Sequence, residues 1–167
     1  MRLGKTVRNT LAGVAILPLA PLLASAGSTS TTFGVSTTIA GVCVVSTASS
    51  GLSFGTYDPT SASDTVANTT FKVECSTGLA YTIGLSPGGS GTDTARTMSS
   101  GSNHLNYGLY ANSGLSTNWG ASTGTVTGTG TGLTTEQTIT VYGKIPKNQY
   151  TAPIGAYADS ITATVTY

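Results

Sequence analysis

The chain has very few charged residues for its length. Only 7 of its 167 residues are basic and 6 are acidic, so charged side chains make up 8% of the sequence. Such a sequence carries no electrostatic footprint for nucleic acid or for an anionic membrane. Threonine, serine and glycine are abundant instead. The composition predicts a surface of hydroxyl groups, as is common in extracellular β proteins and in proteins that live inside assemblies.

Residues suited to catalysis or metal binding are scarce as well. His104 is the only histidine, and pairing it with Asp93 or Asp159 and a serine is a very weak signal because serines are so many. Two cysteines and one histidine supply too few ligands for a zinc site. The six acids show no paired-carboxylate or metal-ligand spacing; they are Asp58, Asp64, Glu74, Asp93, Glu136 and Asp159. We expect no enzyme, no metal site and no cofactor.

The only long apolar stretch lies at the N-terminus, in residues 11–23. It is too short, and too broken by Pro18 and Pro21, to span a bilayer. A basic start precedes it and the small residues Ala24-Ser25-Ala26 follow it, which is the pattern of a cleaved export signal. We therefore predict a signal peptide over residues 1–26, of bacterial type, although a eukaryotic signal looks similar. Its removal leaves four basic and six acidic residues, a net charge of −2.

Both cysteines, Cys43 and Cys75, lie in the part that remains after cleavage. Two cysteines in an oxidising compartment most simply form one intramolecular disulfide. Closing a loop of about thirty residues stabilises a fold by roughly 3 to 4 kcal/mol in the chain-entropy description. We predict this disulfide in place of a metal site.

The exported part reads as an all-β protein. Thr, Val, Tyr and Ile dominate its regular runs, whereas Gly, Pro, Asn and Ser separate them. We count six strand segments from Gly41 onward, and we read the Gly/Thr-rich residues 120–132 as a loop. The predicted segments contain the short run 42–45, then Phe71, Val73 and Cys75, then Leu79, Tyr81, Ile83 and Leu85, then Leu105, Tyr107 and Leu109, then Ile139, Val141 and Ile145 with Gly143 between them, and finally Tyr157, Ile161, Ala163, Val165 and Tyr167.

Strands at this spacing predict a β-sandwich. A seven-stranded immunoglobulin-like sandwich would be one strand short, and the missing strand would follow Tyr167. Such a sandwich leaves a groove between two strand edges. A further alternating run precedes the domain and has no place in it; its members are Phe33, Val35, Thr37 and Ile39.

Several short segments, taken together and in order, point to a family. They are 54–59, 74–78, 81–86, 96–98, 105–110, 119–120, 141–146 and 155–160, beginning with Phe-Gly-Thr-Tyr-Asp-Pro and ending with Gly-Ala-Tyr-Ala-Asp-Ser. In these segments the sequence resembles the spore coat protein U domain family, which includes the subunits of archaic chaperone–usher pili. The resemblance covers nearly all of the exported part.

The resemblance implies an incomplete immunoglobulin-like sandwich that lacks its last strand and is completed by donor-strand complementation. It implies three parts: residues 1–26 as signal peptide, 27–40 as donor-strand extension and 41–167 as the sandwich domain. Cys43 and Cys75 would bridge the first two core strands. The donor residues would be Phe33, Val35, Thr37 and Ile39, and the C-terminal strand that lines the acceptor groove and binds the chaperone would supply Tyr157, Ile161, Ala163, Val165 and Tyr167. The donor register stays open, since Thr31 can be included or Ile39 can belong to the first core strand.

The resulting hypothesis is a structural subunit of a surface pilus, used for attachment and biofilm formation. Its implied partners are identical or related subunits, a periplasmic chaperone and an outer-membrane usher, and its implied location is the cell surface. Two alternatives stay open: a coat protein of a spore or cell surface, and a secreted sandwich that fills its own groove and binds a ligand. Trp119 likewise has two interpretations, an exposed adhesion residue or an ordinary core residue.

Overall fold

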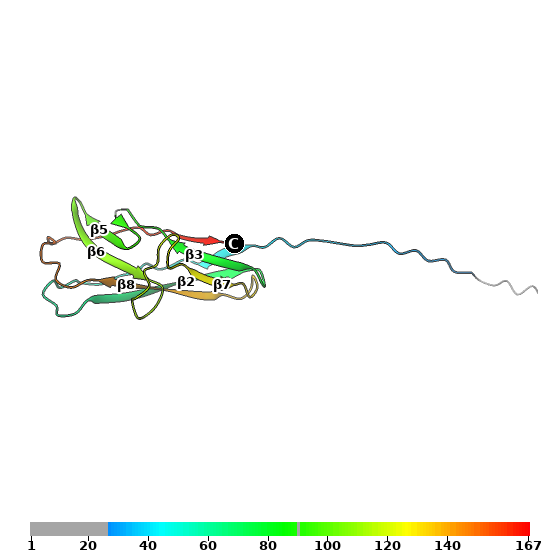
Figure 1. The fold of residues 1–167 in the computed structure, drawn as a ribbon, viewed down its shortest axis with the longest axis horizontal. Helices are drawn as coiled ribbons and strands as arrows, with labels where there is room; N and C mark the ends of the chain where they lie inside the picture. The colour runs from blue at the N-terminus through cyan, green and yellow to red at the C-terminus, as the bar shows by residue number, and fades with distance from the viewer. Residues whose placement is uncertain (1–26, 90) are drawn as a thin grey trace, which may run out of the picture. The chain divides into compact units, whose positions relative to one another are not determined.

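The computed structural model describes residues 27–89 and 91–167, and the predicted signal peptide lies outside these residues. The described part is all-β, as predicted, with nine strands in two sheets (Figure 1). The strands are β1 (Cys43–Thr47), β2 (Thr65–Cys75), β3 (Ala80–Leu85), β4 (Gly91–Thr92), β5 (Ala95–Ser100), β6 (Asn103–Tyr110), β7 (Val126–Thr129), β8 (Gln137–Ile145) and β9 (Ala163–Thr166).

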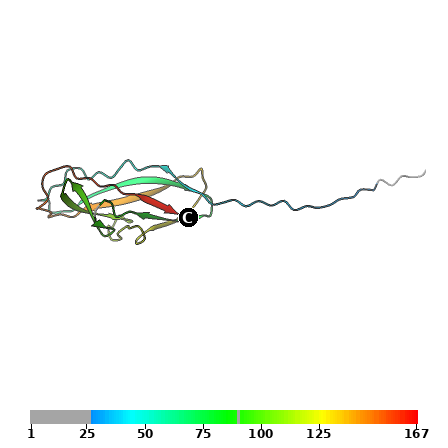
Figure 2. The same cartoon turned by 90° about the horizontal axis from the view of Figure 1, so that it is seen from above.

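The two sheets share the strands unequally. One sheet has the order β1-β2-β8-β6-β5-β4 and the other has the order β7-β3-β9, with antiparallel pairing throughout. Seen from above, β9 lies in a different layer from β2 and β8 (Figure 2). β1 is an edge strand of the larger sheet, and β9 is an edge strand of the smaller one.

Alternating sequence patterns produce the inner faces of the two sheets. In β2, Phe71, Val73 and Cys75 are buried while the residues between them are more exposed. The same alternation buries Ile139, Val141 and Ile145 in β8. The smaller sheet contributes three buried side chains from β3, those of Tyr81, Ile83 and Leu85. In the larger sheet, β6 contributes those of Leu105, Tyr107 and Leu109. The inner faces predicted for these four strands are thus confirmed.

Trp119 completes this core, because its side chain is fully buried and its indole N–H donates to the carbonyl of Ile83 at 2.8 Å. A buried tryptophan needs such a partner for its ring nitrogen. The interpretation of Trp119 as a core residue is therefore correct, and the adhesion interpretation is wrong.

The count of six strand segments is too low, and part of the region read as a loop is a strand. Residues 126–129 form β7, which pairs with β3. Glycine is depleted in strands because it has no side chain to pack. Here it is required, since a Cβ at Gly128 would collide with the ring of Tyr81 and one at Gly130 with the carbonyls of Cys75 and Ser76. Close packing overrides the low strand propensity.

The last predicted strand is shorter than its pattern. Regular pairing is confined to β9, whereas residues 157–162 are extended and held by single contacts. Ala158 exchanges two backbone hydrogen bonds with Ser99, at 2.9 and 3.0 Å, and the carbonyl of Thr162 accepts one from Ser86. The expectation that Tyr167 points inward is wrong, because its side chain is 59% exposed.

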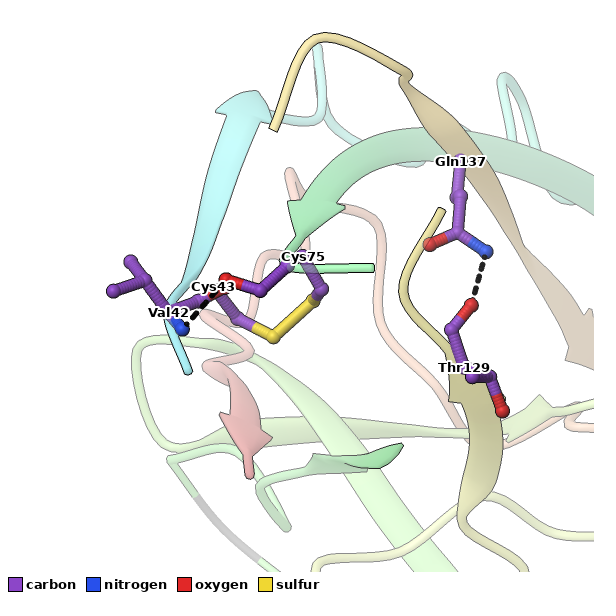
Figure 3. The surroundings of a disulfide bond; sticks show 6 residues. Val42, Cys43, Cys75, Thr129 and Gln137 are labelled. Atoms are coloured by element: carbon purple, nitrogen blue, oxygen red, sulfur yellow. Dashed lines mark hydrogen bonds between the residues drawn. A yellow bond between two sulfur atoms is a disulfide. The ribbon is translucent and has the colours of Figure 1, made fainter. Parts of the chain in front are cut away.

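The predicted disulfide joins Cys43 and Cys75, with their Cα atoms 4.1 Å apart, and so links β1 to β2 (Figure 3). The two residues are direct partners in the antiparallel register. Beside the disulfide, the amide of Val42 donates to the hydroxyl of Ser76 at 3.0 Å. On β8, the amide group of Gln137 donates to the carbonyl of Thr129 at 3.1 Å and ties the two sheets together.

Within the described residues no helix is long and apolar enough to cross a membrane.

The disulfide should contribute strongly to stability, because it closes a loop of 32 residues. We expect replacement of both cysteines by alanine to lower the free energy of unfolding by about 3 to 4 kcal/mol. Urea unfolding of the exported chain with and without reductant measures this. Reductant should destabilise the natural chain and leave the double-alanine variant unchanged; an equal effect on both would contradict the prediction.

Candidate functional site

The sandwich has one open side, bounded by an irregular segment and by an edge strand. Residues 48–57 continue from β1 but form no strand, and within the described chain no backbone–backbone hydrogen bond involves them. Across from them, residues 157–162 lead into β9, which pairs with β3 on one edge only. Two stretches of backbone thus lie at the borders of the sheets with unused amide and carbonyl groups.

A groove runs between these two stretches. It consists of two cavities of about 630 and 430 Å³, which share four lining residues: Leu52, Phe54, Met98 and Tyr157. The larger cavity reaches core side chains at Leu105 and Ile145. The smaller one reaches Phe71, Leu85, Tyr107, Leu109 and Val141. The groove therefore opens directly onto the hydrophobic core.

The first wall of the groove comes from residues 49–57. Leu52, Phe54 and Tyr57 are half-buried and pack against the core. Leu52 and Phe54 lie over Gly143 of β8, where an added Cβ would be 2.9 Å from Leu52 Cδ1 and 2.8 Å from Phe54 Cζ. Gly143 occupies the inward position between Val141 and Ile145, as predicted. The missing side chain at this position is what lets the wall lie close to the sheet.

The second wall is the segment that leads into β9. Tyr157, Ile161 and Ala163 are half-buried and line the groove, whereas Ser160 and Thr162 between them are exposed and line neither cavity. The hydroxyl of Tyr157 donates to the carbonyl of Pro153 at 2.8 Å. Of the five predicted groove residues these three line the cavities, whereas Val165 and Tyr167 do not.

One polar side chain, Asp159, lines the groove among these apolar residues. Its Oδ1 accepts hydrogen bonds from the amides of Gly89 at 2.8 Å and Ser160 at 2.7 Å. Its Oδ2 accepts one from the hydroxyl of Tyr107 at 2.6 Å. Only glycine fits at Gly88, where φ is 86° and a Cβ would overlap this carboxylate.

Tyr107 is held in its neutral, donating form. Burial raises the pKa of its hydroxyl strongly, and the hydrogen bond to the negatively charged Asp159 raises it further. The ring of Tyr107 also packs edge-on against Phe54, with centroids 6.4 Å apart. Tyr107 thus connects the polar group to the first wall of the groove.

Arg96 lies beneath this pair and is fully buried. Its guanidinium donates five hydrogen bonds of 2.7 to 3.2 Å to backbone carbonyls, those of Leu85, Ser86, Asp93 and Trp119. Burial lowers the pKa of Arg96, and the nearby Tyr107, Asp93 and Asp159 oppose that shift. Its ion pair is with Asp93, at 3.9 Å.

The predicted donor residues are not in a strand. The side chains of Phe33, Val35 and Ile39 are 84%, 86% and 88% exposed, and Thr37 is exposed as well.

The sequence also suggested a weak catalytic arrangement around His104, which the structure does not assemble. The ring of His104 forms a hydrogen bond with the hydroxyl of Ser99, at 3.3 Å. Neither aspartate contributes to it, because Asp159 accepts a hydrogen bond from Tyr107 and Asp93 accepts one from the amide of Ala121. In residues 27–89 and 91–167 no group of three potential metal ligands occurs.

Sequence reasoning missed two parts of the site. The first wall was not recognised as part of a groove, although Leu52 and Phe54 alternate with small residues. Asp159 was omitted from the inward set because it is charged, although it has the same spacing as Tyr157 and Ile161. Its position in the alternation was the available signal.

Comparison with known proteins identifies the family. The spore coat protein U domain profile matches residues 29–164, and the chain therefore belongs to this family. One similar solved structure is a chain in the chaperone–tip adhesion subunit pre-assembly complex CsuC–CsuE, from the archaic chaperone–usher Csu pili of Acinetobacter baumannii. The TM-score is 0.55 at 20% identity, over 78% of this chain and 41% of that chain. No curated protein matches. The resemblance noted from sequence is thus confirmed, and this likeness supports the immunoglobulin-like fold.

The Tyr107–Asp159 hydrogen bond should stabilise the open side of the fold. We expect Tyr107→Phe to lower the free energy of unfolding by about 1.5 to 3 kcal/mol, the usual range for a bond to a charged group. Tyr142→Phe on β8 is the matched control and should change little. Because the pKa of Tyr107 is raised on folding, its contribution should persist at neutral pH and fall as pH rises above about 10. Denaturant unfolding at pH 7 and pH 11 tests both statements, and an equal loss in the two variants would refute them.

Proposed function

We propose that this chain is a structural subunit of a surface pilus, assembled by the chaperone–usher pathway through donor-strand exchange. The observation that carries the proposal is the apolar groove between residues 49–57 and 157–163, which opens onto the core. A groove between two free backbone edges is the geometry in which an added strand hydrogen-bonds while its alternate side chains enter pockets. The role is structural rather than catalytic.

The inserted strand is residues 27–40 of a second copy, and the sandwich domain is residues 41–167. Phe33, Val35, Thr37 and Ile39 alternate with small residues, so they form one face of a strand. Three of these side chains are large, apolar and exposed. An exposed apolar strand is an aggregation hazard unless it has a designated partner. The family match begins at residue 29 and so includes this segment.

The energy of such a joint suits a durable fibre. Burying Phe33, Val35 and Ile39 gives roughly 1.5 to 3 kcal/mol for each side chain. Each new backbone hydrogen bond adds about 1 kcal/mol net. Residues 48–57 and the free edge of β9 supply unpaired groups for such bonds.

The open groove also defines the partners that we propose. A core exposed along one side needs cover before assembly, which a periplasmic chaperone provides, and an outer-membrane usher then joins the subunits. The comparison with a chaperone–subunit complex supports the first of these partners. The disulfide fits passage through an oxidising compartment. The fibre would lie on the cell surface and serve attachment and biofilm formation.

The self-filled sandwich, one of the alternatives, would place residues 27–40 in the groove of the same copy. The exchange that we propose differs only in taking this segment from a second copy. A coat protein assembled through the same groove would differ in location and not in mechanism.

A single charge on the inward face of the donor strand should stop assembly. We expect Phe33→Asp to abolish fibres, because a carboxylate would enter the apolar groove without a partner. Ser36→Asp places the same charge on the opposite face and should leave fibres intact. Electron microscopy of cells that express each full chain measures the outcome. Fibres that form normally with Phe33→Asp, or after deletion of residues 27–40, would overturn the proposal.

The groove should also bind the donor segment as a free peptide. We expect a peptide of residues 29–40 to raise the melting temperature of the Phe33→Asp chain by several degrees, since a ligand at 100 times its Kd adds about 2.7 kcal/mol. The same peptide with aspartate at the Phe33 position is the control and should have no effect. Thermal unfolding measures the shift. An equal response to both peptides would show that the groove does not recognise the face of the donor segment that contains Phe33.

A further inference from the structure

Asp159 is the polar member of an apolar groove wall, and it retains hydrogen-bonding capacity. A carboxylate offers about four acceptor positions. Gly89 and Ser160 occupy two on Oδ1, and Tyr107 occupies one on Oδ2. In the described chain no further donor reaches Oδ2. This oxygen belongs to a residue that lines the smaller cavity, so a side chain entering the groove meets it.

The two walls of the groove run in opposite chain directions. The larger cavity is lined by Tyr57 at the end of the first wall and by Pro153, which shortly precedes the second wall. The smaller cavity is lined by Ser49 and Ala163. The first wall therefore runs away from the Ser49 end and the second wall runs toward it. An inserted strand must be antiparallel to one wall and parallel to the other.

The exit point of the N-terminal segment decides between these directions. Val42 is bonded to Ser76, just before β3 begins, and the start of β3 pairs with the end of β9, where Thr82 faces Thr166. The segment thus leaves its own domain at the end where β9 stops. A copy stacked head to tail presents residue 39 to the opposite end of the groove, near Tyr157. The inserted strand then runs antiparallel to β9.

We propose that the Asp159–Tyr107 pair is a polar subsite that accepts the hydroxyl of Thr37 from a second copy of this chain and thereby sets the register of the inserted strand. This inference rests on the proposed donor-strand function. Thr37 is the polar member of the donor face, as Asp159 is of the groove wall.

Placing Thr37 opposite Asp159 fixes the other pairs. In an antiparallel register Ile39 then lies opposite Tyr157, Val35 opposite Ile161 and Phe33 opposite Ala163. The large Phe33 thus meets the smallest residue of the wall. Ile39 enters beside the larger cavity of about 630 Å³. The sizes of the donor side chains and the polarity of Thr37 thus favour the same register.

The competing registers keep the same face inward and differ by two residues. A slip in one direction places Ile39 against Asp159, and a slip in the other places Val35 there. Either aliphatic side chain would remove water from the carboxylate without donating a hydrogen bond. An unsatisfied buried polar group is costly, so each slip should be disfavoured by about tenfold or more.

Engineered disulfides in the assembled fibre test the register directly. Val35→Cys with Ile161→Cys in the full chain should give a ladder of covalent multimers on a non-reducing gel. Directly opposed residues have Cα atoms about 4.5 to 5.5 Å apart, within disulfide range, whereas neighbours two residues away are too distant. Val35→Cys with Ala163→Cys reports one slipped register, and Phe33→Cys with Ile161→Cys reports the other. All three pairs leave Thr37 and Asp159 intact.

The role of the hydroxyl is tested in the same chains. Thr37→Val should lower the yield of the Val35–Ile161 ladder about tenfold relative to the slipped ladders, and Asp159→Asn should lower that ratio less, because an amide oxygen still accepts a hydrogen bond. Thr38→Val, on the opposite face of the strand, is the matched control and should leave the ratio unchanged. Thr37→Ser keeps the hydroxyl and should preserve it.

The outcomes separate this inference from the proposed function. No ladder from any of the three pairs would overturn both donor-strand exchange and the register. A dominant ladder from a slipped pair would support exchange and overturn the register. A Val35–Ile161 ladder that is indifferent to Thr37→Val would overturn the polar subsite. A ladder lost with Thr37→Val and kept with Thr38→Val supports the inference.

Discussion

The backbone edges that face each other across the groove are not hydrogen-bonded to one another, and the rest of the structure is arranged around that gap. A β-sandwich is stable when both inner faces are covered. Here Leu52, Phe54, Tyr157 and Ile161 stay half-buried because no strand lies between them. The core is therefore complete in composition and open along one side. One further strand would satisfy both the backbone groups and the apolar side chains.

A fold that is open along one side needs rigidity elsewhere, and three interactions supply it. The disulfide joins β1, the strand that precedes the first wall, to β2. The indole of Trp119 is bonded to β3. Arg96 donates hydrogen bonds to the backbone carbonyls of Leu85 at the end of β3, of Asp93 and of Trp119. A buried cation is costly unless all its donors are used, and here each bond also fixes a loop. The contacts of Trp119 and Arg96 fix β3, the strand with which β9 pairs at the end of the second wall.

The alternating strands and the disulfide were predictable from sequence because their signals are local. Phe71 to Cys75 and Ile139 to Ile145 follow a period of two, and two cysteines leave one pairing. β7 was not predictable, since its Gly128 is required by the ring of Tyr81, which is distant in sequence. The burial of Arg96 could not be predicted from the sequence either, because arginine is seldom fully buried and the acceptors of its hydrogen bonds are backbone groups. The site was predicted on the β9 side and missed on the Leu52 side, where no strand forms.

An inserted strand has no turn to set its register, and this separates it from the strands of a hairpin. A slip of one residue turns its apolar face outward and is strongly penalised. A slip of two residues keeps that face inward, so only the identity of each side chain discriminates. A donor face made of four aliphatic residues would bury more apolar surface and would bind in several registers. Thr37 buries less, and opposite Asp159 it makes the correct register chemically distinct. In the exchange that we propose, the threonine in an otherwise apolar face would therefore trade some affinity for a single mode of binding, as a fibre of identical joints would require.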